Sequence, residues 1–219
     1  MNFSVSEENY IKSIYHLQQQ SDTVTTNSLA NELQTRPASV TDMLKKLQTK
    51  KLLEYEKYRG FRLNATGNKV ALNIVRRHRL WEYFLVTKLR FEWDKVHAIA
   101  EDLEHVSSIE LIQKLDNFLN YPPIDPHGDP IPDMNGKMAV IKQVSIADVP
   151  LKKNVTVSSV GNQSPEMLEL LNHYHIGIGT ALKVNMRFDF DGSAEIKVLK
   201  HAACILSEQV AKNIFVYHD

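Results

Sequence analysis

The stretch from residue 27 to 51 constrains the fold most, because two helical patterns of unequal length meet there across a tight turn. The first pattern, NSLANEL, spans residues 27–33 and repeats apolar side chains at helical spacing. After the turn QTR, PASVTDMLKKLQTKK opens with Pro37, which suits a first helical turn because its missing N–H has no helical partner there. Val40, Leu44 and Leu47 form the apolar stripe of this second helix and leave a polar, basic outer face. The order of short helix, turn and longer helix predicts a helix-turn-helix.

The segments on either side extend this motif to a winged helix. Residues 6–20 carry apolar side chains at helical spacing, with Ser6 as the expected N-cap. Residues 52–67, LLEYEKYRGFRLNATG, predict a two-stranded hairpin that turns at Arg59-Gly60, with Lys57 and Tyr58 also at its tip. A hairpin after the second helix is a wing, and a basic tip suits contact with phosphate or the minor groove.

The N-terminal third also differs in charge from the rest of the chain. Residues 1–80 carry 13 Lys and Arg against 7 Asp and Glu, a net charge of +6, although the whole chain has a formal net charge of zero. The remaining residues therefore balance it with −6. A basic segment is typical of a part that meets a polyanion, and together with the winged-helix pattern it predicts binding to double-stranded DNA.

Helical patterns continue from Thr66 to about Asn120, and a Pro- and Gly-rich segment, YPPIDPHGDPIPDMNGKM, ends them. The apolar faces exceed what one short helical segment can bury, which predicts a dimer interface. Their large side chains include Trp81, Phe84, Leu85, Leu111, Leu115 and Phe118. From about Ala147 strand-like runs dominate, with one short helix in SPEMLELLNHY. We therefore expect a mainly α chain with a small β domain: a winged helix-turn-helix at 1–70, a helical dimerisation domain at 71–145 and a small β-barrel at 146–219.

Composition restricts the setting of the protein. No apolar run approaches the roughly 18 residues that span a bilayer, and the start MNFSVSEENY lacks the basic-then-apolar order of a signal peptide. The single cysteine, Cys204, rules out an intrachain disulfide, fits a reducing compartment and is expected to be a buried core thiol. We therefore expect a cytoplasmic protein without a membrane partner.

Two helical stretches combine histidine with carboxylates at one-turn spacing. His78 and Glu82 are four apart in RRHRLWE, and KVHAIAEDLEHV places His97, Glu101, Glu104 and His105 along one helical face. A histidine and a carboxylate at this spacing can share a divalent ion. Either pair alone is also compatible with a solvated charged surface. Two such helices beside a DNA-binding module favour metal binding.

The residues RRHRLWE, KVHAIAEDLEHV and DPHGDPIP resemble signatures of the diphtheria toxin repressor and manganese transport regulator family of iron- and manganese-dependent repressors. The resemblance covers essentially the whole chain, and it implies an SH3-like C-terminal barrel and about two metal sites per subunit. Positions that match its first site are His78, Glu82 and His97, with Glu166 and Gln163 from the barrel, and with Asp125 and His127 as further candidates. Positions that match its second, activating site are Asn9, Glu101, Glu104 and His105.

This sequence departs from the family pattern at two positions of the second site. Manganese sensors usually have an aspartate where this chain has Asn9, so one negative charge is missing and Glu8 or water could replace it. Some of them have a glutamate at the position of Lys12, which supports a pair of ions; a protonated lysine cannot ligate, which argues against such a pair here. Iron sensors have a thiol at the position of Glu101. Oxygen and imidazole donors alone suit Mn²⁺ or Fe²⁺, and Glu101 favours manganese.

The resemblance implies a dimeric repressor of metal-uptake genes that binds palindromic operator DNA when Mn²⁺ or Fe²⁺ is bound. Base edges are expected to meet Ser39, Thr41 and Asp42, and phosphates to meet Arg36, Lys45, Lys46, Tyr58 and Arg59, with Pro37 and Ala38 at the same helix start. Two alternatives are a winged-helix regulator that responds to a small organic ligand and a metallohydrolase. The chain has no motif that supports catalysis, so we expect no enzymatic activity.

Overall fold

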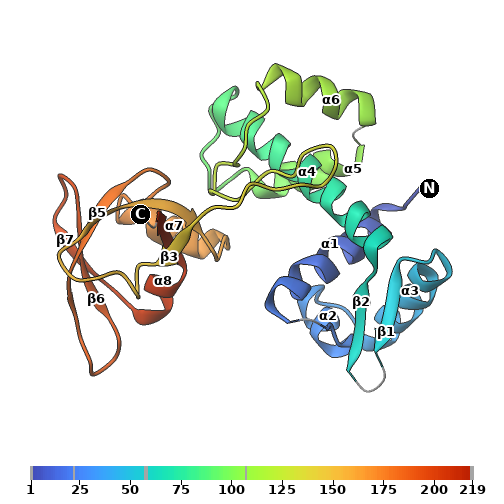
Figure 1. Cartoon of the computed structure of the whole chain (residues 1–219), viewed down its shortest axis with the longest axis horizontal. Helices are drawn as coiled ribbons and strands as arrows, with labels where there is room; N and C mark the ends of the chain where they lie inside the picture. The colour runs from blue at the N-terminus through green and yellow to red at the C-terminus, as the bar shows by residue number, and fades with distance from the viewer. Residues whose placement is uncertain (1, 22, 57–58, 107, 218–219) are drawn as a thin grey trace. The chain divides into compact units, whose positions relative to one another are not determined.

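The computed structural model describes residues 2–21, 23–56, 59–106 and 108–217. By contacts these residues divide into two units: residues 1–78, 101–113 and 132–137 form the first, and residues 79–100, 114–131 and 138–219 form the second. Figure 1 shows the elements of both along the chain. Among the described residues, no helix has the length and hydropathy that crossing a membrane requires.

The first unit begins with three helices and a hairpin. They are α1 (Val5–Gln20), α2 (Thr26–Glu32), α3 (Pro37–Thr49), β1 (Leu53–Glu56) and β2 (Gly60–Leu63). The strands pair antiparallel, which confirms the expected winged helix-turn-helix order. The tip residues Lys57 and Tyr58 lie outside the described residues.

A shared hydrophobic core holds α1 against α2 and α3. Ile11 and Ile14 of α1 pack in the same buried cluster as Leu29 of α2 and Val40 and Leu47 of α3. The apolar stripe expected for α3 is therefore the face that turns inward. Because α1 and α3 share one core, a shift of α1 carries α3 with it.

The helix caps agree with the sequence in one case and correct it in another. Pro37 occupies the first turn of α3, as expected. The N-cap of α1 is Ser4, not Ser6: the Ser4 hydroxyl accepts from the Glu7 backbone N–H, and the Glu7 side chain accepts from the Ser4 N–H. This reciprocal capping box satisfies two N–H groups that a helix start leaves unpaired, so the helix begins two residues earlier.

Three further helices follow, and the first two of them bear the histidine and carboxylate patterns expected from the sequence. They are α4 (Ala65–Thr87), α5 (His97–Val106) and α6 (Ile109–Phe118). The boundary between the units falls within α4, after His78, and within α5, after Ala100. In the first unit, Gly67 at the start of α4 has no space for a Cβ, which would lie 2.4 Å from the backbone oxygen of Leu52.

The second unit contains the C-terminal antiparallel sheet. Its strands are β3 (Gln143–Ser145), β4 (Asn154–Val160), β5 (Ala181–Arg187), β6 (Ala194–Val198), β7 (Ala203–Leu206) and β8 (Ile214–Tyr217), in the order β3-β8-β4-β5-β6-β7. Helix α7 (Pro165–His173) packs Leu168 and Leu171 into the core of this sheet. Strand β3 and the short helix α8 (Glu208–Lys212) were not expected from the sequence. Cys204 packs against this core from the edge strand β7, so its thiol is half-buried and not fully buried as expected.

Candidate metal centres and DNA-binding surface

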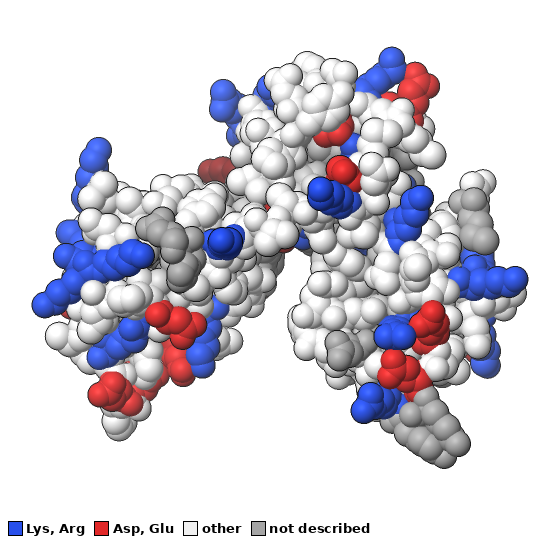
Figure 2. Space-filling view, viewed as in Figure 1, with Lys and Arg blue, Asp and Glu red and all other residues white. Residues whose placement is uncertain are grey.

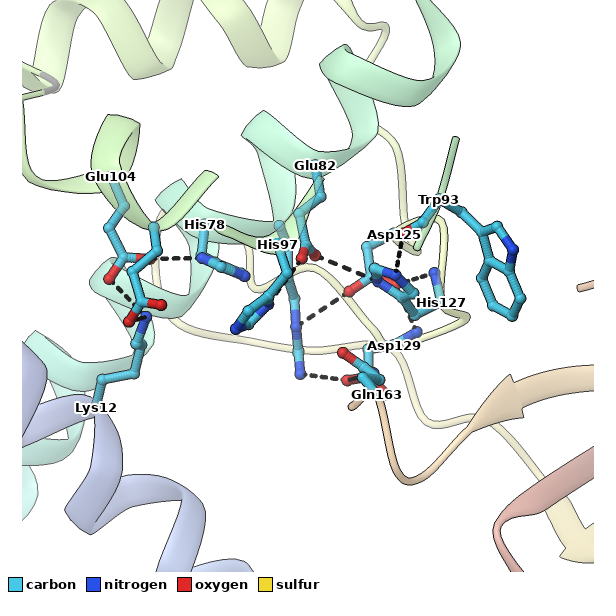
Figure 3. A network of polar contacts seen from close by, with 12 residues as sticks. Lys12, His78, Glu82, Trp93, His97, Glu104, Asp125, His127, Asp129 and Gln163 are labelled. Carbon is cyan, nitrogen blue, oxygen red and sulfur yellow. Dashed lines mark hydrogen bonds and ion pairs between the residues drawn. The ribbon is translucent and has the colours of Figure 1, made fainter. Parts of the chain in front are cut away.

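One cluster of possible metal ligands lies entirely in the second unit. Glu82, Asp125 and His127 are all buried, and each offers a donor atom that lies within 4.8 Å of the other two. Glu82 comes from α4, whereas Asp125 and His127 come from the Pro- and Gly-rich loop (Figure 3). All three residues are candidate ligands from the sequence, and the structure brings them together.

The loop that carries Asp125 and His127 is held by its own backbone. Asp125 Oδ1 accepts hydrogen bonds from the backbone N–H of His127 at 2.8 Å and of Asp129 at 3.0 Å. Gly128 adopts a φ of +88°, and a Cβ on it would lie 1.9 Å from the backbone oxygen of Ser158 in β4. Only glycine permits both this conformation and this close approach. The loop therefore presents its two side chains from a rigid turn docked on the sheet.

The imidazole of His127 is oriented for ligation. Its Nε2 lies 2.9 Å from the backbone oxygen of Trp93, so Nε2 donates and Nδ1 carries the lone pair. Nδ1 lies 3.5 Å from Glu82 Oε2, which is long for a hydrogen bond. Burial alone would lower the pKa of His127, but its contact with Glu82 and the charges of Glu82 and Asp125 raise it. An approaching cation would compete with a proton for the same nitrogen.

The same cluster has an excess of negative charge. Burial, together with the charges of Asp129 and Glu82, raises the pKa of Asp125 to about 7. Arg79 compensates in part, with Nη2 at 2.8 Å from Asp129 Oδ2 and Nε at 3.4 Å from Asp125 Oδ2. Three carboxylates beside one guanidinium form a site that a divalent cation would stabilise.

The other expected ligands of the first site differ in their placement. His97 Nδ1 lies 3.2 Å from Glu82 Oε1, so His97 borders the cluster, with its side chain half exposed. His78 precedes Glu82 by one turn on the same helix, so both side chains project from one face of α4. Gln163 donates through Nε2 to Asp129 Oδ2 at 3.2 Å, which places it beside the cluster, and its role as a ligand stays a prediction. Glu166 lies exposed in the first turn of α7, and its role as a ligand stays a prediction.

A second polar cluster joins α1 to α5 within the first unit. Its contacts join Lys12 and Glu8 of α1 to Glu101, Glu104 and His105 of α5, and Asn9, the fourth position expected for the second site, follows Glu8 on α1. The Glu104 carboxylate is fully buried and lies 2.6 Å from His78 Nδ1, and His105 Nδ1 lies 2.7 Å from Glu8 Oε2. Burial alone would raise the pKa of Glu104, but His78 and Lys12 outweigh it and lower that pKa, so Glu104 is ionised.

Two donor atoms in the second cluster lack a hydrogen-bond partner among the described residues: Asn9 Oδ1 and His105 Nε2, both buried. A buried polar atom without a partner carries a cost that a bound ion would remove. Glu8, left open as a replacement for the missing aspartate, also lies in this cluster and bonds Arg77 at 2.7 Å as well as His105.

Sequence patterns did not identify every charged residue of the two clusters. Lys12 was noted only as a departure, yet its Nζ lies 2.7 Å from Glu104 Oε1 and 3.2 Å from Glu101 Oε1. Arg79 and Asp129 were not expected to take part, although both lie inside the motifs RRHRLWE and DPHGDPIP. Their charge was visible in the sequence, but their partners come from distant segments.

The surface expected to meet DNA is exposed in the first unit. Every described residue assigned to it is exposed: Arg36, Pro37, Ala38, Ser39, Thr41, Asp42, Lys45, Lys46 and Arg59. A hollow of about 300 Å³ beside α3 is lined by Thr41, Lys45 and Tyr55 among others. In Figure 2 basic side chains lie over the region of α3, and basic and acidic side chains are mixed along the hairpin, where Arg62 pairs with Glu54 at 3.2 Å. Tyr58 lies outside the described residues.

Two known protein families match the DNA-binding region and the region of the candidate metal ligands. Residues 2–61 match the iron-dependent repressor N-terminal DNA-binding domain, and residues 64–133 match the iron-dependent repressor metal-binding and dimerisation domain. The HTH-type transcriptional regulator MntR of Oceanobacillus iheyensis is 35% identical over 116 residues, which are 53% of this chain and 78% of that protein. The iron-dependent repressor IdeR of Mycobacterium leprae is 29% identical over 157 residues, 68% of each chain.

Solved structures extend the likeness to nearly the whole chain. A manganese-dependent transcriptional repressor in complex with manganese superposes with a TM-score of 0.86 and 31% identity, over 96% of this chain and 99% of that one. ScaR with bound Cd²⁺ gives a TM-score of 0.83 and 28% identity, over 96% and 98%. The expected fold class, a helical DNA-binding and dimerisation region followed by an antiparallel sheet domain, is thereby confirmed. The chain belongs to the family of metal-dependent transcriptional repressors that includes MntR and IdeR.

Proposed function

We propose that this protein is a cytoplasmic, homodimeric repressor that binds palindromic operator DNA when it holds Mn²⁺ or Fe²⁺, and that it represses metal-uptake genes. The observation that carries the proposal is the buried group Glu82, Asp125 and His127, whose excess negative charge a cation would neutralise, in a chain with an exposed recognition helix. Operator binding and dimerisation are family properties. The identity of the metal and the regulation of metal-uptake genes are proposed for this protein in addition.

The first site would be held by Glu82, Asp125 and His127, with His97, His78, Gln163 and Glu166 as the further ligands expected from the sequence. Carboxylate oxygen and imidazole nitrogen suit Mn²⁺ and Fe²⁺, and no described residue of the cluster offers a thiolate. The Trp93 carbonyl supports the fit, because it sets the His127 tautomer that leaves Nδ1 as the donor.

The second site would be held by Asn9, Glu101, Glu104 and His105. Its fit rests on the two unsatisfied atoms, Asn9 Oδ1 and His105 Nε2, which come from different helices. A bound divalent ion would supply positive charge shared between α1 and α5.

The packing of α1 against α3 would transmit this metal-dependent contact to the DNA-binding surface. Ile11 and Ile14 of α1 lie in the core that also holds Val40 and Leu47 of α3. Fixing Asn9 against α5 therefore fixes the recognition helix as well. In a symmetric dimer this sets the separation of two recognition helices, which must match successive major grooves. The effect on DNA affinity is limited by the difference in metal affinity between the two arrangements.

On DNA, the exposed start of α3 would read bases through Ser39, Thr41 and Asp42. Lys46 and Arg36 would contact phosphates, as would Lys45, Arg59 and Tyr58. Pro37 and Ala38 lie at the same exposed helix start and permit close approach to the groove.

The test is selection of genomic DNA fragments by the purified protein with Mn²⁺, with Fe²⁺ under anaerobic conditions, and with a chelator. We expect retention with metal, release by chelator and a shared inverted repeat. The double variant Glu104→Ala with His105→Ala should fold and lose metal-dependent retention, whereas Asp102→Ala, an exposed acid on the same helix, should keep it. Unchanged regulation in the double variant would instead favour a regulator that responds to an organic ligand. Metal-dependent hydrolysis that requires Glu101 would favour the metallohydrolase.

A further inference from the structure

The ammonium group of Lys12 lies inside the second cluster. Its Nζ is 2.7 Å from Glu104 Oε1 and 3.2 Å from Glu101 Oε1, and only 11% of its side chain is exposed. We propose that Lys12 is a built-in cation which takes the place of a second divalent ion between α1 and α5, limits the site to one ion and weakens the binding of that ion. This inference deepens the proposed function and rests on it.

The charges of the cluster support this assignment. Three carboxylates, Glu8, Glu101 and Glu104, face two fixed cations, Lys12 and Arg77, and Arg77 Nη2 lies 2.7 Å from Glu8 Oε1. With neutral histidines the cluster carries one net negative charge. One divalent ion would leave it at +1, and a second ion would add two more charges beside the buried Lys12 and Glu104. Electrostatics therefore allows one metal ion beside Lys12.

The arrangement of the donor atoms also indicates a single metal ion. Lys12 bonds one oxygen of each of Glu101 and Glu104. His78 is 2.6 Å from the other Glu104 oxygen, Oε2. The donors without a hydrogen-bond partner among the described residues are Asn9 Oδ1 and His105 Nε2, and His105 Nε2 lies 3.5 Å from Glu104 Oε1. These atoms suit a single ion near His105, with Lys12 on the Glu101 side of Glu104.

The ammonium group of Lys12 also links two helices. Lys12 lies on α1 and its two partners lie on α5, so the chain itself makes part of the link that a pair of ions would make. This part of the link does not depend on the metal concentration. Among the described residues, Asn9 Oδ1 and His105 Nε2 are the buried donors of this cluster left for a metal to join.

The experiment is a titration with Mn²⁺ in which electron paramagnetic resonance measures the free ion and the bound species. Wild type is compared with Lys12→Met, which keeps the aliphatic stem and removes the charge, and with Lys12→Glu, which places a carboxylate there. Lys69→Met removes the same charge from an exposed position of α4 and is the matched control. Circular dichroism before the titration establishes that each variant is folded.

We expect Lys12→Met to bind the same number of ions as wild type, with the second-site affinity raised about tenfold or more because a repelling charge is gone. Lys12→Glu should bind one more Mn²⁺ per subunit, with the spectrum of a spin-coupled pair, and Lys69→Met should match wild type. Unchanged affinity in folded Lys12→Met together with no additional ion in folded Lys12→Glu would overturn the inference and leave the proposed function standing. Absence of Mn²⁺ binding in wild type and all variants would overturn the proposed function, and the inference with it.

Discussion

Glu104 Oε2 lies 2.6 Å from His78 Nδ1, so a carboxylate of the second proposed site is hydrogen bonded to an imidazole of the first. The bond makes Nδ1 the protonated nitrogen and gives Nε2 the lone pair that a metal requires. Figure 3 shows that the same carboxylate also meets Lys12. Proposed ligands of the two sites are therefore joined by a direct polar contact in the first unit.

This contact predicts that Glu104→Gln affects both sites. The second site should be lost, and the first should bind Mn²⁺ roughly 10-fold more weakly, because outer partners of a ligating histidine typically contribute 10- to 100-fold in affinity. Glu101→Gln changes a carboxylate that contacts Lys12 and should weaken the second site alone. Calorimetric titration with Mn²⁺ resolves the two sites. Equal effects of both variants on the first site would contradict the coupling.

Asp125→Asn should separate stability from metal binding. Burial and the neighbouring charges of Asp129 and Glu82 raise the pKa of Asp125 to about 7, so its ionised form is unfavourable in the metal-free fold. For a group whose pKa is raised on folding, the stabilisation is complete below the unfolded pKa and is lost as the pH rises through the folded value. Asparagine keeps an oxygen that can accept the backbone N–H of His127 and Asp129 without a charge to desolvate.

We therefore expect the metal-free Asp125→Asn variant to melt no lower than wild type at pH 8, and the increase in melting temperature on adding Mn²⁺ to shrink. Differential scanning calorimetry with and without Mn²⁺ measures both quantities. A variant that is less stable without metal and gains as much as wild type from Mn²⁺ would show that Asp125 is a structural group.

Gly128→Ala should damage the first site from outside its ligand set. A Cβ there would lie 1.9 Å from the Ser158 backbone oxygen at a φ of +88°, so the loop cannot keep its place on β4. We expect a loss of about 2–4 kcal/mol in the free energy of unfolding and at least a tenfold loss of first-site affinity. Gly177→Ala is the control, because a Cβ at Gly177 meets no atom within 4 Å. Similar melting temperatures for the two variants would refute this account of the loop.

How far the sequence predicted this molecule depends on the range of the interactions concerned. Pro37 and the stripe Val40, Leu44 and Leu47 predicted α3 well, because a helix of 13 residues repeats its pattern over several turns. Strand β3 and helix α8, with three and five residues, are too short to show a period. The error at the start of α1 was avoidable: Ser4 is followed by Glu7 three residues later, the signature of a capping box, and Ser6 is followed by Asn9.

The candidate sites depend on contacts that no local pattern contains. The spacing of His78 and Glu82 favoured a metal ion, but the meeting of Glu82 with Asp125 and His127 joins α4 to a loop more than forty residues away, and only family resemblance suggested it. The contacts of Lys12 could not be predicted from a local pattern either. Its bonds to Glu101 and Glu104 span 89 and 92 residues, and a sequence pattern cannot show that a lysine fills a gap between two acids.

On DNA, Lys46→Ala and Ser39→Ala should fail in different ways. Loss of a phosphate contact at Lys46 should weaken binding to operator and unrelated DNA by a similar factor and lower the salt slope by about 1. Loss of a base contact at Ser39 should weaken operator binding alone, by about 1 kcal/mol for a single hydrogen bond. Fluorescence anisotropy with Mn²⁺ at several salt concentrations measures both. Lys142→Ala, an exposed lysine just before β3, should leave binding unchanged. A selective loss of operator binding in Lys46→Ala would reassign that side chain to base readout.

Ile109→Glu should weaken the dimer. Helix α6 exposes three large apolar side chains, Ile109 at 76%, Phe118 at 59% and Leu111 at 42%, which water would contact in a monomer. A glutamate buried at such an interface must lose its hydration without a partner, so we expect the dimer dissociation constant to rise about 100-fold. Phe190→Glu changes a fully exposed aromatic between β5 and β6 and should leave the dimer intact. Sedimentation velocity over a range of protein concentrations distinguishes the two. A dimer that survives Ile109→Glu but dissociates with Phe190→Glu would move the interface from α6 to the sheet.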